Sequence, residues 1–134
     1  MPMIKIKEKE YQYNENEIIN FSEGLIGLPE MRQAVLISIK EFEPFCWLAS
    51  TEDERNRFIV VNPNEIFSDY RTDSINELAN LEVKTLAIVK ISSDWKKTTV
   101  NLRAPIFINP ETHRGTQLIL SQSNYGLAEL LPQN

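Results

Sequence analysis

Every second residue from Val100 to Ile108 is aliphatic, and this alternation is the clearest pattern along the chain. A period of two is typical of an extended strand, because successive side chains point to opposite faces. Asn109-Pro110 and Gly115 are residues that favour turns, and the stretch from Thr116 to Leu120 is again compatible with a strand. The pattern therefore predicts a β-hairpin with a long connection.

The second face of the first predicted strand carries Asn101, Arg103, Pro105 and Phe107. Asparagine and arginine resist burial, and proline cannot donate a hydrogen bond to a neighbouring strand. The face is therefore expected to be open, on an edge strand or a bulged strand. The alternative is a second buried face.

Short apolar segments separated by turn residues recur along the rest of the chain. Ser74 and Glu77 form a capping box that predicts one short helix over 75–81, and 29–32 could form a helical turn. The many short strands predict a mainly β fold, a small antiparallel β-barrel-like or sandwich domain spanning 1–134. Strands are expected over 4–9, 17–21, 34–39, 45–50, 57–61 and 84–91, the last of them central.

The charge and cysteine content narrow the functional classes. The chain has 134 residues and a net charge of −5, which argues against a general nucleic-acid binder and is compatible with a basic protein partner. Its one cysteine fits a reducing compartment. No apolar run is long enough to span a bilayer, and the first residues lack the apolar core of a signal peptide. A cytoplasmic location without membrane contact is therefore expected.

The candidate catalytic residues are few. His113 is the only histidine and lies in a polar turn, and Cys46 lies in an apolar strand with the character of a structural thiol. Zinc-ligand spacing and phosphate-binding glycine patterns are absent. We therefore expect a protein that is not an enzyme and needs no cofactor or metal. A small cytoplasmic enzyme with an unrecognised site near Cys46 or His113 stays open as the alternative, since dyad partners need not be close in sequence.

A second informative stretch is the segment Phe21-Ser22-Glu23-Gly24-Leu25-Ile26-Gly27-Leu28. Its two glycines allow backbone angles that other residues resist, so the segment is expected to form an ordered loop. Leu25, Ile26 and Leu28 are either partly exposed or plug one end of the barrel.

These stretches carry a resemblance to a known family. The segment from Phe21 to Leu28 resembles the F-x-E-G-L-x-G-F/L signature of the flagellar assembly factor FliW family, with leucine at the last position where phenylalanine is commoner. The segment from Val100 to Asn109 resembles that family's V-N-L-x-A-P-I-x-I-N strand, and His113-Arg114-Gly115 with Gln117 matches its R-G-x-Q turn. The segment from Phe45 to Ser50 resembles the family's F-x-W-L-Q-S strand, with Ala49 in place of the usual glutamine. The segments 60–63 and 66–70 resemble its V-x-x-P and F-x-D-Y patterns.

The resemblance implies a non-enzymatic β-barrel-like protein of the bacterial cytoplasm with two partners. One is flagellin, held in a chaperone-like manner before secretion, and the other is the basic translational regulator CsrA, whose repression of flagellin translation the protein would antagonise. Direct nucleic-acid binding is not implied. The glycine segment and the open strand face are expected to contact flagellin through its amphipathic helices, and an acidic turn is expected to meet CsrA. The predicted partner-binding residues are Glu23, Leu25, Leu28, Glu52, Asp53, Asn101, Arg103, Pro105 and Phe107.

Overall fold

A computed structural model describes residues 2–72, 83–121 and 123–132. The fold is mainly β, as predicted, and the helices within the described residues are short 3-10 turns: η1 (Glu15–Glu17), η2 (Lys40–Phe42), η3 (Pro63–Glu65) and η5 (Trp95–Lys97). The helix predicted over 75–81 lies outside the described residues. The strands are β1 (Met3–Ile6), β2 (Lys9–Gln12), β3 (Ile19–Phe21), β4 (Gln33–Ser38), β5 (Cys46–Ser50), β6 (Arg57–Val61), β7 (Lys84–Lys90), β8 (Thr99–Val100), β9 (Ile106–Ile108), β10 (Arg114–Gln117) and β11 (Glu129–Leu130).

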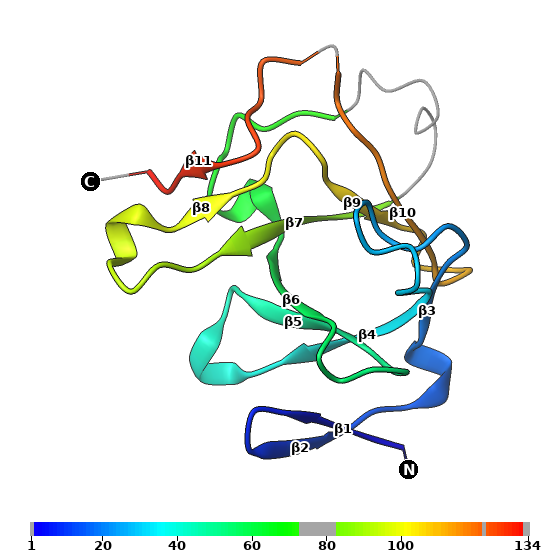
Figure 1. The fold of residues 1–134 in the computed structure, drawn as a ribbon. Helices are drawn as coiled ribbons and strands as arrows, with labels where there is room; N and C mark the ends of the chain where they lie inside the picture. The colour runs from blue at the N-terminus through cyan, green and yellow to red at the C-terminus, as the bar shows by residue number, and fades with distance from the viewer. Residues whose placement is uncertain (1, 73–82, 122, 133–134) are drawn as a thin grey trace.

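The main sheet closes on itself as a barrel (Figure 1). Strands follow the order β7-β6-β5-β4-β3-β10-β9, and β9 pairs back onto β7. The pairings around this ring are antiparallel except for β10 with β3, which is parallel. Closure removes the open edges of the ring, and the resulting barrel supports the loops described below.

Alternating side chains of the barrel strands are buried on both faces. In β4, Ala34 and Leu36 point into the barrel interior, whereas Val35 and Ile37 pack under the N-terminal residues. The interior cluster also contains Leu48, Phe21 and Ile106. Because both faces of these strands are covered, their sequences are apolar at successive positions and do not alternate between apolar and polar residues. The segments that cover the outer faces therefore decide which positions are exposed.

Strands β1 and β2 form a separate hairpin that packs against the outside of the barrel (Figure 1). Ile4 and Ile6 of β1 are buried against Val35, Ile37 and Ala49. The sequence pattern had predicted a single strand over 4–9, which proves to be one arm of this hairpin and its turn. The remaining strand predictions agree with the structure to within one or two residues, while 29–32 forms a turn instead of a helical segment.

The strand predicted from Val100 to Ile108 is divided into two pieces that pair with the same strand. Val100 in β8 is opposite Val89 of β7, and Ile106 in β9 is opposite Leu86. Ile106 is therefore six residues from Val100 along the chain, whereas their partners in β7, Leu86 and Val89, are three residues apart. The extra residues are pushed out as a wide bulge over 101–105, a device that redirects a strand. The predicted hairpin is confirmed for β9 and β10, although β10 begins two residues earlier and ends three residues earlier than expected.

Candidate functional site

The parallel contact between β3 and β10 brings together two segments that are far apart in the sequence. The backbone N–H of Asn20 donates to the carbonyl of His113 at 2.8 Å. A Cβ atom on Gly115 would lie 2.4 Å from the ring of the buried Phe21, so glycine is needed at this crossing. His113 itself has a left-handed backbone, with φ of 58°. The sequence signal at 113–115 thus reflects a backbone hydrogen bond to β3 and a close approach of Gly115 to the Phe21 ring.

The glycine loop, residues 22–28, is a tight turn beside β10 (Figure 1). Leu25 and Leu28 exchange two backbone hydrogen bonds of 3.1 and 2.9 Å, which leaves Ile26 and Gly27 at the tip. Gly24 and Gly27 have positive φ values of 69° and 81°. Because left-handed backbone favours glycine, these two positions explain the glycine spacing in the sequence.

The side chain of Gln117 in β10 connects the glycine loop to the barrel through hydrogen bonds. Its Oε1 accepts the backbone N–H of Ile26 at 2.9 Å, and its Nε2 donates to the carbonyl of Ala104, also at 2.9 Å. One amide therefore joins the loop tip, β10 and the end of the bulge. Gln117 was part of the recognised pattern, but its structural role was not evident without the fold.

The glycine loop presents one apolar side chain to solvent. Ile26 is 52% exposed, and Ile119, two residues beyond Gln117, is 56% exposed. Leu25 was predicted to bind a partner, yet it is only 3% exposed and plugs the barrel interior, and Leu28 packs partly against the same cluster. The plug alternative is therefore correct for Leu25, and the loop residue available for contact is Ile26. Glu23 is exposed, and its partner role stays a prediction.

A polar pocket of about 650 Å³ opens beside the same strand crossing. Arg32 and Arg114 line it with exposed side chains, and neither forms an ion pair among the described residues. Two guanidinium groups in a polar hollow can bind carboxylates of a partner. The other lining residues are Asn20, Phe21, Ser22, Gln33, Thr112 and Gly115.

The prediction of an open face carrying Pro105 and Phe107 is wrong. Both side chains are buried, and Phe107 is only 2% exposed. Closure of the ring places β9 between β7 and β10, so β9 is not an edge strand. Pro105 lies in the bulge just before β9, where its missing N–H breaks no strand pairing, and its carbonyl accepts the backbone N–H of Leu118 at 3.1 Å. The alternative of a second buried face is the one the structure adopts.

Asn101 and Arg103 are half-buried and hold the bulge in shape. The Asn101 side-chain oxygen accepts the backbone N–H groups of Arg103 and Ala104 at 3.1 and 3.0 Å. The Arg103 guanidinium donates to the carbonyl of Tyr125 at 3.2 Å. These contacts give both residues a structural role, and their predicted contact with a partner is untested.

Tyr70 forms a hydrogen bond to the backbone of the bulge. It was not among the predicted site residues. Its hydroxyl donates to the carbonyl of Leu102 at 2.8 Å, and its ring lies 4.6 Å from that of Tyr125, centroid to centroid. Burial, followed by the neighbouring Tyr125, raises the pKa of Tyr70 above its ordinary value. The hydroxyl therefore stays protonated and donating.

The predicted acidic turn between β5 and β6 is present and well ordered by hydrogen bonds. The Ser50 hydroxyl accepts the backbone N–H groups of Glu52 and Asp53, each at 3.1 Å. Asp53 forms a bidentate pair with Arg55, at 3.1 and 2.9 Å, and this pairing lowers the pKa of Asp53. Glu52 and Glu54 are exposed. The unpaired negative charge of the turn is thus carried by the two glutamates.

The candidate catalytic residues occupy separate structural settings. Burial raises the pKa of the Cys46 thiol, with a smaller opposing effect from Lys84. His113 contributes its backbone to the strand crossing, with its N–H donating to the carbonyl of Asn109. No hydrogen bond joins Cys46 to His113, and no metal-binding cluster of acidic, histidine and cysteine side chains occurs, within the described residues. In the same part of the chain, no helix has the length and apolar character to cross a membrane.

Comparison with known proteins matches the chain to one family. The family model described as FliW protein matches residues 4–131. The flagellar assembly factor FliW of Clostridium botulinum (strain Alaska E43 / Type E3) is 39% identical over 127 residues, covering 90% of each chain, and that of Clostridium beijerinckii is 33% identical over 138 residues, covering 98% of each. A crystal structure of the flagellar assembly factor FliW superimposes with a TM-score of 0.86 at 28% identity, covering 97% of this chain and 96% of that one. The chain therefore belongs to the FliW family of non-enzymatic flagellar assembly factors, which confirms the resemblance noted in its motifs.

Proposed function

We propose that this flagellar assembly factor acts in the cytoplasm by binding flagellin and the translational regulator CsrA, and that it thereby relieves CsrA repression of flagellin translation. The observation that carries the flagellin part is the Ile26 tip. Its backbone is held by Gln117 across 91 residues of sequence, and its side chain is left 52% exposed. A rigid tip bearing an apolar side chain binds at a low entropic cost, because little has to be ordered on association.

Flagellin is the partner that suits this surface. Its terminal segments, in the family picture, are amphipathic helices, and such helices bind through an apolar stripe. Ile26, whose backbone N–H Gln117 accepts, and Ile119, two residues beyond Gln117, supply exposed apolar side chains. The neighbouring Arg32 and Arg114 can pair with acidic residues beside such a stripe. A few residues commonly carry most of the binding energy of an interface, and arginine is enriched among them.

Replacing Ile26 by serine is expected to weaken flagellin binding about tenfold, because burying an isoleucine side chain contributes roughly 1.5–3 kcal/mol and a loss of about 1.4 kcal/mol is a tenfold change in affinity. The variant should fold normally, since Ile26 is exposed. The matched control is Leu127→Ser, which removes another exposed leucine-sized side chain, 64% exposed, from outside the glycine loop. Isothermal titration calorimetry with purified flagellin measures both. Equal affinities for wild type and Ile26→Ser would remove the loop tip from the interface.

The acidic turn suits CsrA, a basic protein. Opposite charges across an interface speed association more than they increase affinity. Glu52 and Glu54 offer the unpaired carboxylates, while Asp53 is already paired with Arg55. The turn is therefore proposed as part of the CsrA surface, distinct from the Ile26 tip.

Reversing Glu52 and Glu54 to lysine is expected to slow association with CsrA roughly tenfold at low salt, because steering changes association rates by about 10-fold or more. The difference from wild type should shrink near molar ionic strength, where screening acts within about 3 Å. Stopped-flow or surface plasmon resonance measures the rate. The charge-matched control is the double reversal of Glu65 and Asp69 to lysine, two exposed acidic residues outside the turn. An unchanged association rate at low salt would place the CsrA surface elsewhere.

A further inference from the structure

The turn of the N-terminal hairpin holds a lysine in an unfavourable backbone conformation. Ile6 pairs with Lys9, so Lys7 and Glu8 form the two-residue turn. Lys7 has φ of 58°, a region that favours glycine, asparagine or aspartate in such turns. The Lys7 side chain is exposed and adds nothing to the core. Residues held in disfavoured backbone regions cluster at functional positions. The Lys7 side chain is therefore a candidate for a binding role.

That side chain extends over Trp47, the half-buried indole of β5. The Lys7 Nζ lies 6.0 Å from the ring centroid, and the Arg57 guanidinium carbon lies 5.5 Å from it. The Arg57 guanidinium is fixed by a 2.9 Å hydrogen bond from its Nη1 to the carbonyl of Glu54. Two cations therefore flank a single aromatic ring on the surface of a protein with a net charge of −5.

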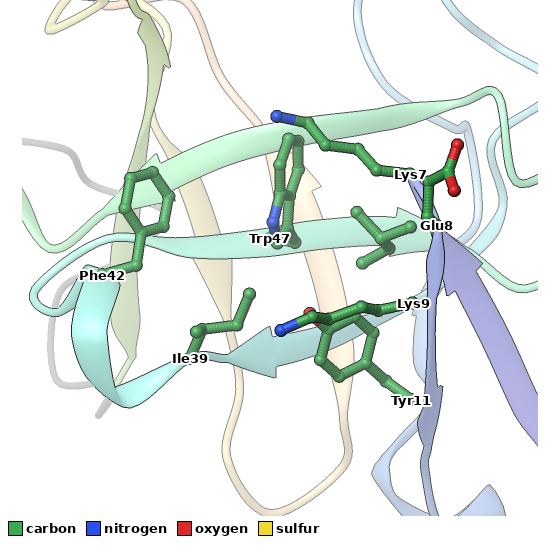
Figure 2. Close-up of a pocket in the computed structure, with 8 residues that line it drawn as sticks. Lys7, Glu8, Lys9, Tyr11, Ile39, Phe42 and Trp47 are labelled. Carbon is green, nitrogen blue, oxygen red and sulfur yellow. The ribbon is translucent and has the colours of Figure 1, made fainter.

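The indole lines a pocket of about 390 Å³ between the hairpin and the barrel (Figure 2). Figure 2 shows Lys7 and Lys9 reaching across this pocket, whereas the Glu8 carboxylate points away from Trp47. Neither lysine forms an ion pair in the described part of the chain. The apolar lining is provided by Ile6, Tyr11, Ile39, Phe42 and Trp47.

We propose that this pocket is a docking site for an acidic peptide segment of a partner protein, in which an apolar side chain enters beside Trp47 and adjacent carboxylates meet Lys7 and Lys9. Charge complementarity identifies the occupant, because Lys7 and Lys9 line an apolar pocket on a protein of net negative charge, and the carboxylate of Glu8, the one acidic lining residue, points away from Trp47. The volume is near the lower end of the roughly 300–1,000 Å³ range of binding clefts. It therefore suits one or two side chains of an extended segment. This site is separate from the Ile26 tip and does not depend on the partners proposed above.

An aromatic ring beside cations can also stack a nucleotide base, so single-stranded RNA is the competing class of ligand. RNA binding rests on an extended basic surface that neutralises several phosphates. Here two lysines, Lys7 and Lys9, line the pocket of a chain whose net charge is −5, and two cations are too few to neutralise several phosphates. The peptide is therefore the better match.

The test uses a short fluorescein-labelled peptide of alternating glutamate and leucine, with fluorescence anisotropy as the readout of binding. Two variants remove one cation each: Lys7→Gly, which also relieves the unfavourable φ and so should not lower stability, and Lys9→Gln. Lys5→Gln is the matched control, because Lys5 is exposed on the same hairpin but does not line the pocket. Emission of Trp47, recorded in a Trp95→Phe background, reports whether the peptide reaches the pocket.

We expect the peptide to bind the wild-type protein, to shift Trp47 emission, and to bind about fivefold more weakly to each pocket variant, the effect of losing one exposed charge contact. Lys5→Gln should leave the affinity unchanged. The proposal would be overturned if the peptide does not bind, or if the two pocket variants bind it as wild type does. Equal binding of a lysine–leucine peptide, or preferred binding of an oligouridine that quenches Trp47, would overturn it as well.

Discussion

Replacing Phe107 by alanine is expected to lower the free energy of unfolding by about 3–5 kcal/mol, the usual cost of deleting a buried aromatic side chain. The ring is 2% exposed and belongs to β9, which lies between β7 and β10 where the barrel closes. The melting temperature should fall by roughly 10–15 °C for a chain of this size. Urea unfolding and a thermal scan followed by circular dichroism measure the two effects.

The control is Ile26→Ala, which shortens an exposed side chain and should change stability by no more than about 0.5 kcal/mol. The pair of variants separates the two readings of the Val100–Ile108 stretch. If Phe107→Ala folded with unchanged stability but lost flagellin binding, the ring would be a contact residue and its assignment to the core would be incorrect.

Replacing Gly24 by alanine is expected to destabilise the fold by about 2–5 kcal/mol. A left-handed backbone costs a non-glycine residue about 1–2 kcal/mol, and Gly24 has φ of 69°. In addition, the new Cβ would lie 2.3 Å from the carbonyl oxygen of Pro29 and 2.7 Å from its Cα. These are backbone atoms that cannot move aside without displacing the loop, and such overpacking typically costs a further 1–3 kcal/mol or so.

Gly27→Ala is the matched control for this prediction. Gly27 has a similar positive φ of 81°, but a Cβ atom there would meet nothing within 4 Å. Its substitution should therefore lower the free energy of unfolding only by the cost of a left-handed backbone, about 1–2 kcal/mol. Denaturant unfolding of both variants gives the comparison directly. Equal losses of stability would mean that the loop can shift away from Pro29, and that the close approach does not restrain it.

The contrast between these residues illustrates what could be predicted from sequence. The glycines at 24 and 27 indicated positive φ angles, and both have them. The close approach of Gly24 to Pro29 and the open space around Gly27 depend on the folded loop. Similarly, the cationic pair around Trp47 joins β1–β2 to β5–β6, so no local pattern marks it.

The amino-acid sequence by itself determined the positions of most strands, the β9–β10 hairpin, the glycine loop and, through its motifs, the family. These features are local, since they follow from side-chain alternation and turn residues within a few positions. Only the tertiary structure decided which faces are covered. Closure of β9 onto β7 buried Phe107, whereas Ile26 remained exposed at a tip held by Gln117. Burial depends on contacts between distant segments, so alternation can place a residue on a face without showing what covers that face.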